Sequence, residues 1–204
     1  MIDFDSRARQ WDSNPEFAER GRTLAAAIHA RVALTTKMRA LDFGCGTGQL
    51  SIPLARELAH VTCIDTSAGM LEVLNEKIAA QGLTNLTAQC RDVIQSDLPD
   101  GHFDLIMSSM TLHHIKDTDA ILRKFAAHLQ AGGWLCLADL DQEDGSFHGA
   151  DVAVHHGFER EELARRAQRA GFTQVRFDTV FVIRKEQGGS PRDYPVFLLT
   201  ARKG

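Results

Sequence analysis

The sequence predicts an α/β fold in which helices cover both faces of a mostly parallel sheet. Short apolar runs alternate with longer amphipathic runs between residues 38 and 141, a pattern typical of strands joined by crossover helices. A glycine-rich turn at residues 44–48 follows the first apolar run. Near the end of the chain, the turn residues 188–191 separate two long apolar runs, which predicts that the final strand pair is antiparallel.

Each expected element follows from its own run of residues. Runs of β-branched and other apolar residues predict strands at Met38–Phe43, Val61–Ile64, Leu86–Cys90, Phe103–Ser108, Trp134–Ala138, Gln174–Arg184 and Tyr194–Thr200. Apolar residues at helical spacing predict helices at Phe17–Val32, Gln49–Leu58, Ala68–Gln81, Thr118–Leu129 and Glu159–Ala170. Gly82 and Gly171 follow two of these helices, as expected of helix-ending residues. The segment Gln142–Phe158 is rich in Gly, Asp and His and predicts a long, lid-like loop.

Composition predicts one soluble domain in a reducing compartment. Of the 204 residues, 44% are hydrophobic and 25% charged, and the net charge is −4, so we expect no large nucleic-acid footprint. We expect no membrane span, because no apolar run reaches about 18 residues. The acidic N-terminus is unlike a signal peptide, and the four cysteines form no C-x-x-C pair, so a cytoplasmic location with free thiols is predicted.

The stretch Leu41–Gly48 carries the strongest functional signal. Its three glycines have the spacing G-x-G-x-G, and Asp42 stands two residues before the first of them. Glycines between a strand and a helix allow a ligand to lie almost against the backbone. The spacing differs from the G-x-G-x-x-G of most dinucleotide-binding proteins.

Acids at the ends of later strands extend this site. Asp65 closes the second strand about twenty residues beyond the glycine turn, where a carboxylate can accept hydrogen bonds from ribose hydroxyls. Asp92 follows the third strand and could accept a bond from the exocyclic amine of adenine, while Met70 and Val93 could pack on the ring. Ser108 ends the fourth strand. A single acid at a strand end is as often a helix cap, so the prediction depends on the whole constellation.

These residues resemble the motifs of class I S-adenosylmethionine-dependent methyltransferases, and Leu112–Ile115 is similar to the UbiE-like, small-molecule branch. The resemblance covers most of Met38–Asp141. It implies a Rossmann-like three-layer sandwich with a seven-stranded sheet and an antiparallel last strand. It also implies S-adenosylmethionine as cofactor, with the methionine part beside Gly44, Gly46 and Gly48. The expected cofactor-binding residues are Asp42, Gly44, Cys45, Gly46, Gly48, Asp65, Thr66, Met70, Asp92, Val93 and Ser108.

Histidines are the candidate catalytic residues. His113 and His114 follow the fourth strand, and His148 lies in the lid-like segment. Methyl transfer needs an acceptor held in line with the donor and needs a base only if the acceptor must lose a proton. Imidazole titrates near neutral pH and can supply that base. A metal set drawn from His148, His155 and His156 with Asp144 or Asp151 is the less favoured alternative because its spacing matches no compact motif, so no metal site is predicted.

The chain is therefore predicted to be a single methyltransferase domain over residues 1–204. Residues 1–36 form an N-terminal cap and helix, residues 37–141 bind the cofactor, and residues 142–204 supply the lid-like loop, a helix and the final strand pair. The predicted reaction is methyl transfer to a small-molecule acceptor. Two alternatives stay open, an NAD-dependent oxidoreductase and a non-catalytic S-adenosylmethionine-binding module. The sequence predicts neither the acceptor nor the oligomeric state.

Overall fold

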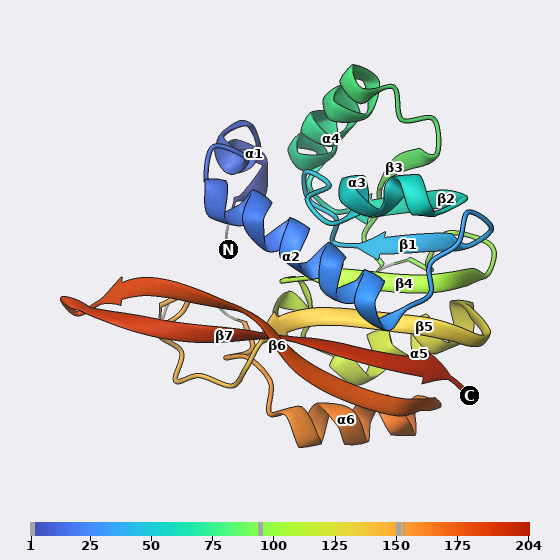
Figure 1. Ribbon diagram of the computed structural model, residues 1–204. Helices are drawn as coiled ribbons and strands as arrows, with labels where there is room; N and C mark the ends of the chain where they lie inside the picture. The colour runs from blue at the N-terminus through green and yellow to red at the C-terminus, as the bar shows by residue number, and fades with distance from the viewer. Residues whose placement is uncertain (1–2, 94–95, 150–151, 153) are drawn as a thin grey trace.

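A computed structural model describes residues 3–93, 96–149, 152 and 154–204 (Figure 1). Its centre is a seven-stranded sheet with the order β3-β2-β1-β4-β5-β7-β6. The strands are β1 (Arg39–Phe43), β2 (His60–Asp65), β3 (Leu86–Cys90), β4 (Phe103–Ser109), β5 (Leu129–Leu140), β6 (Phe172–Gln187) and β7 (Ser190–Lys203). The first five strands are parallel, and β7 runs antiparallel to both β5 and β6. The predicted seven-stranded, Rossmann-like fold with an antiparallel last strand is confirmed.

Helices cover both faces of this sheet (Figure 1). They are α1 (Phe4–Trp11), α2 (Pro15–Arg31), α3 (Ser51–Leu54), α4 (Ala68–Gln81), α5 (Thr118–His128) and α6 (Arg160–Arg169), with short 3-10 turns η1 (Ala55–Glu57) and η2 (Leu112–His114). Helices α2, α3 and α4 pack on one face, and α5 and α6 pack on the other. Among the described residues, no helix has the length and apolar character needed to cross a membrane.

Two hydrophobic clusters separate the layers, as the strand pleat requires. Successive residues of a strand point to opposite faces, so Leu105 and Met107 pack with α2 and α4, whereas Ile106 packs with α5. In β1, Ala40 belongs to the first cluster and Leu41 to the second. Both faces of the central strands are therefore buried, which explains why their sequences are continuously apolar.

The structure differs from the predicted elements in several places, including β5, which starts at Leu129 and not at Trp134. The helix expected at Gln49–Leu58 is only α3 followed by η1, and the side chain of Asn85 donates hydrogen bonds to the carbonyls of Ala55 and Leu58 at 2.7 and 3.0 Å. Helix α1 was not expected at all. Strands β6 and β7 are longer than predicted, and they meet at a tight turn where Gly188 and Gly189 both have positive φ.

The strand order predicts that a ligand binds beside β1. The chain moves from β1 outward through β2 to β3, and the other strands lie on the opposite side of β1, beginning with β4. In open α/β sheets, ligands bind at the carboxyl ends of the strands where the order reverses in this way. The glycine loop after β1 and the segment after β4 both lie at that point.

Candidate functional site

The glycine loop adopts a backbone that favours glycine at all three positions. Gly44, Gly46 and Gly48 have φ values of 66°, 52° and 80°. A Cβ at Gly44 would collide with the side chain of Thr111, whose hydroxyl donates a hydrogen bond to the Gly44 carbonyl at 3.2 Å. At Gly46, by contrast, a Cβ would meet no atom within 4 Å. The loop is therefore packed at its start and open at Gly46, which leaves room for a ligand against the backbone.

Asp65 fixes the open part of this loop. One of its carboxylate oxygens accepts a hydrogen bond from the Gly46 amide at 2.8 Å, and the other accepts one from the Ser67 amide at 2.9 Å. Burial raises the pKa of Asp65, and these backbone hydrogen bonds oppose that rise. The predicted ribose-binding carboxylate thus lies directly beside the predicted methionine-binding loop. This pairing of donors and acceptors fits an adenosyl cofactor.

Asp42 is buried beneath the loop and does not face the crevice. It is 1% exposed and accepts a short hydrogen bond from the Ser51 hydroxyl. Burial raises its pKa to about 7, and the nearby charge of Asp65 adds to the effect. Burial likewise raises the pKa of Cys45 well above its usual value. Asp42 and Cys45 are therefore buried residues of the glycine-loop segment.

The remaining predicted cofactor residues differ in their burial and contacts. Met70 and Val93 are buried, 2% and 3% exposed, whereas Thr66 is exposed. The carbonyl of Asp92 accepts hydrogen bonds from the amide and hydroxyl of Ser96 at 2.9 and 2.7 Å. Ser108 is 2% exposed and donates its hydroxyl to the Phe43 carbonyl at 2.7 Å. In this structure Ser108 therefore ties β4 to the end of β1, and its role beside the cofactor stays a prediction.

The N-terminal helices reach into the site, which sequence reasoning only partly anticipated. Asp12, directly after α1, accepts hydrogen bonds from Thr47 and Gln49 of the glycine loop, both at 2.6 Å, and from Lys77 of α4 at 2.7 Å. Asp5 accepts hydrogen bonds from the Ser67 hydroxyl at 2.6 Å and the Gly69 amide at 2.8 Å, at the start of α4.

No sequence pattern marks Asp5 or Asp12, because each acts on loops more than thirty residues away. The ring of Phe4 packs edge-on against His114 with centroids 5.6 Å apart. Helix α1 therefore contacts both the start of α4 and the histidines after β4.

Three histidines gather after β4. Met110 adopts a φ of 56° and turns the chain into η2, which presents His113 and His114. His113 Nδ1 lies 2.6 Å from the carboxylate of Asp139, and its Nε2 lies 2.9 Å from His148 Nε2. One ring nitrogen from each of His113, His114 and His148 lies within 4.8 Å of the others. The three predicted catalytic histidines are thus brought together although His148 is 35 positions from His113.

The electrostatics of this cluster keep two of its rings neutral. Burial and the neighbouring His113 lower the pKa of His114 to about 4, and the same two effects lower the pKa of His148 to about 4. Asp139 is fully buried and also accepts the backbone amides of His113 and Leu140, at 3.1 and 2.7 Å. The Asp139 carboxylate thus contacts both the ring and the backbone amide of His113.

The β6–β7 hairpin fixes the segment that carries His148. Lys185 donates to the Phe147 carbonyl at 2.9 Å, and Gln187 donates to the Ser146 carbonyl at 2.8 Å. The hydroxyl groups of Tyr194 and Ser146 are 2.7 Å apart. The predicted lid-like loop is therefore attached to the hairpin along residues 146–147.

The other metal set considered from the sequence is not assembled. The His155 ring lies 3.0 Å from the Ile115 carbonyl, and Asp144 accepts a hydrogen bond from Arg192 at 2.7 Å. His156 packs beside Gly145. Asp151 lies outside the described residues. Of that set, only His148 joins the cluster after β4.

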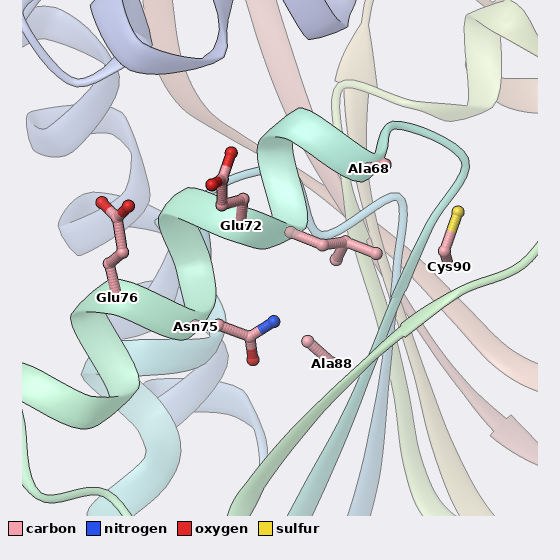
Figure 2. Close-up of a pocket in the computed structure, with 7 residues that line it drawn as sticks. Ala68, Glu72, Asn75, Glu76, Ala88 and Cys90 are labelled. Atoms are coloured by element: carbon pink, nitrogen blue, oxygen red, sulfur yellow. The ribbon is translucent and has the colours of Figure 1, made fainter.

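A separate hollow lies between α4 and the edge strand β3 (Figure 2). It has a volume of about 620 Å³, and it contains no predicted cofactor or catalytic residue. Its lining residues are Ala68, Leu71, Glu72, Asn75, Glu76, Ala88 and Cys90. Arg9 pairs with both Glu72 and Glu76 at 3.2 Å. This hollow is a surface feature apart from the crevice at the glycine loop.

Comparison with known proteins decides between the candidate cofactor families. Residues 40–133, which hold the glycine loop and the acids, match the family described as "Methyltransferase domain". This match and the named relatives below support a class I, S-adenosylmethionine-dependent methyltransferase domain. This methyltransferase domain spans β1 to the start of β5 and includes His113 and His114.

Two curated relatives are methyltransferases by name. An uncharacterized methyltransferase of Schizosaccharomyces pombe is 32% identical over 155 residues, which are 68% of this chain and 54% of that protein. The ubiquinone biosynthesis O-methyltransferase of Xanthomonas campestris is 33% identical over 130 residues, 63% of this chain and 54% of that protein. The chain thus spans about half the length of the curated relatives it matches.

A solved structure shares the fold of the methyltransferase domain. Phosphoethanolamine N-methyltransferase 2 of Haemonchus contortus, solved with S-adenosyl-L-methionine, aligns with a TM-score of 0.74 at 17% identity. The alignment covers all of this chain and 60% of that one.

Proposed function

We propose that the chain is a methyltransferase that uses S-adenosylmethionine to methylate a small-molecule acceptor, as in the UbiE-like branch. The open cradle at Gly46, bordered by the carboxylate of Asp65, is the observation that carries this proposal. The match of residues 40–133 to a methyltransferase domain supports the methyl donor over a dinucleotide. The names of the relatives, one of them a ubiquinone biosynthesis O-methyltransferase, support a small organic acceptor.

Within this proposal, each segment of the chain has its own role. Bound S-adenosylmethionine supplies the activated methyl carbon. The glycine loop and Asp65 would bind and orient its methionine and ribose parts, and Asp92, Met70 and Val93 would hold the adenine. Residues 1–36 cap the crevice through the carboxylate of Asp12, and residues 142–204 bring His148 to the acceptor side. These parts act together as one domain.

His113 is the best-placed base if the acceptor carries a proton. Asp139 faces its Nδ1 at 2.6 Å, and a carboxylate in this position fixes the orientation and tautomer of the ring. His114 and His148 are neutral at pH 7 because their pKa values are lowered to about 4, so they can accept a hydrogen bond from an acceptor hydroxyl. Positioning of the acceptor against the methyl group supplies the larger part of the rate enhancement.

The experiment that tests the proposal measures release of S-adenosylhomocysteine. The full chain is incubated with S-adenosylmethionine and a metabolite extract, divided by ultrafiltration into small molecules and macromolecules. We expect product only with the small-molecule fraction. Product with the macromolecular fraction alone would contradict the acceptor class, and binding of the cofactor without turnover in either fraction would favour the non-catalytic module.

A matched variant separates chemistry from cofactor binding. His113→Gln should lower turnover by about 10²-fold or more, the usual contribution of a general base, with an unchanged Kd for S-adenosylhomocysteine. His102→Ala, at an exposed position before β4, should leave both quantities unchanged.

A further inference from the structure

We propose that His113, His114 and His148 form a binding site for a divalent transition-metal ion, with Zn²⁺ as the type ion. The three rings come from two segments that the fold brings together, η2 and the segment after β5. Three imidazole ligands are the set used by zinc when a fourth position stays open for water or a substrate. The sequence predicts no metal site, and the only metal set considered from it was His148, His155 and His156 with Asp144 or Asp151.

The distances among the ring nitrogens suit such an ion. Zinc–nitrogen bonds of about 2.0–2.1 Å place two tetrahedral ligand atoms about 3.3 Å apart. His113 Nε2 and His148 Nε2 are 2.9 Å apart, and the three ligand atoms all lie within 4.8 Å of one another. His113 is buried, whereas His114 and His148 are both half-buried and present their rings beside it.

A second shell of hydrogen bonds already orients the central ligand. Metal-binding histidines almost always donate their other ring N–H to a carboxylate or carbonyl, which fixes the tautomer. The Nδ1 of His113 faces Asp139 at 2.6 Å, so Nε2 presents its lone pair to the cluster. Asp139 is fully buried and receives two backbone amides as well, so its position is fixed independently of any ion.

The other two ligands are held by separate elements. His148 follows Ser146 and Phe147, whose carbonyls accept hydrogen bonds from Gln187 and Lys185 of the hairpin. The ammonium of Lys185 lies 3.5 Å from the centre of the Phe147 ring, so its charge is engaged by that residue. The His114 ring packs edge-on against Phe4 of α1. The three ligands are therefore supported by β5, the hairpin and α1.

The open coordination position defines the kind of acceptor that would bind. The cluster follows Thr111, which contacts the glycine loop at Gly44. If the proposed function holds, an ion here would select acceptors with an ionisable oxygen or sulfur, because a divalent cation lowers the pKa of a group that it binds. With the ion bound, His113 Nε2 would be a ligand and not a base, so the ion would take over the activation of the acceptor that His113 supplies in the metal-free chain. This consequence rests on the proposed function, whereas the metal site itself does not.

Metal binding is tested on the full chain after treatment with a chelator and dialysis. Calorimetric titration with Zn²⁺, in the absence of any cofactor, should give one ion per chain, and elemental analysis should confirm the ratio. His148→Ala and His114→Ala should each weaken binding by about 100-fold or more. Asp139→Asn should weaken it by about 10- to 100-fold, as expected for a second-shell partner. His102→Ala, at an exposed position, should change nothing.

Titration with Co²⁺ gives a second readout that a merely structural role of the histidines would not produce. Visible absorption bands of a four-coordinate site should appear in the wild type and in His102→Ala and be absent in His148→Ala. Circular dichroism establishes that each variant is folded, and His114→Gln replaces any alanine variant that is not.

The proposal is overturned if the wild type binds no stoichiometric Zn²⁺, or if His148→Ala and His114→Ala bind it as tightly as the wild type. Because no cofactor is present, this failure is distinguishable from a failure to bind S-adenosylmethionine.

Discussion

Replacement of Gly46 by alanine should separate cofactor binding from folding. Gly46 has a φ of 52°, and a Cβ there would meet no protein atom within 4 Å. The stability cost is therefore backbone strain alone, about 1–2 kcal/mol for a non-glycine residue in this region. The smaller conformational freedom of alanine in the unfolded chain offsets about 0.4–1 kcal/mol of this cost. We expect a net loss of about 1 kcal/mol, which lowers the Tm by about 2–4 °C in a chain of this size.

Gly82→Ala is the matched control for this variant. Gly82 ends α4 with a φ of 63°, and a Cβ there also meets open space. Both variants should lose the same stability in urea unfolding. In calorimetric titration with S-adenosylhomocysteine, however, only Gly46→Ala should weaken binding, by at least about tenfold or 1.4 kcal/mol, because its methyl group enters the cradle.

Two results would refute this reasoning. Wild-type affinity in Gly46→Ala would mean that the cofactor does not lie against the glycine loop. An equal loss of affinity in Gly82→Ala would mean that the effect arises from general destabilisation and not from the cradle.

Three further substitutions test the account. Burial raises the pKa of Asp42 to about 7 from 3.8, so the folded chain keeps a proton that the unfolded chain loses between these values. This group's contribution to stability therefore falls by about 4 kcal/mol as pH rises from about 4 to 7, and Asp42→Asn should remove that slope in urea unfolding measured across this range. Asp139→Asn should lower turnover by about 10²-fold and change its pH profile, with no change in Kd for S-adenosylhomocysteine, because Asp139 acts through His113. Asp12→Ala should raise that Kd several-fold by releasing the glycine loop, whereas Asp193→Ala, which removes an exposed ion pair on the hairpin, should leave it unchanged in the same titration.

Local patterns in the sequence were sufficient for the sheet and the cofactor loop. The central strands β1, β2, β4 and β5 are mostly buried and were located from their apolar runs, because a buried parallel strand needs no partner to be recognised. The edge strand β3 is largely exposed and was located from its short β-prone run. The glycine loop was recognised for the same reason, since positive φ values at Gly44, Gly46 and Gly48 make the requirement for glycine local.

Features that depend on distant contacts were missed. Helix α1 has few apolar residues. The carboxylates of Asp5 and Asp12 find their hydrogen-bond partners on the glycine loop and at the start of α4, and no local pattern reveals these contacts. The same limit applies to the histidine cluster. The sequence gives each histidine separately, but the meeting of His113 and His148 depends on the hairpin that fixes residues 146–147.

The most direct test of the central claim is a calorimetric titration of the full chain with S-adenosylhomocysteine and, separately, with NAD. The account predicts that S-adenosylhomocysteine binds with one molecule per chain and that NAD gives no heat of binding. Saturable binding of NAD with no response to S-adenosylhomocysteine would contradict it, because the cradle at Gly46 and Asp65 would then serve a dinucleotide.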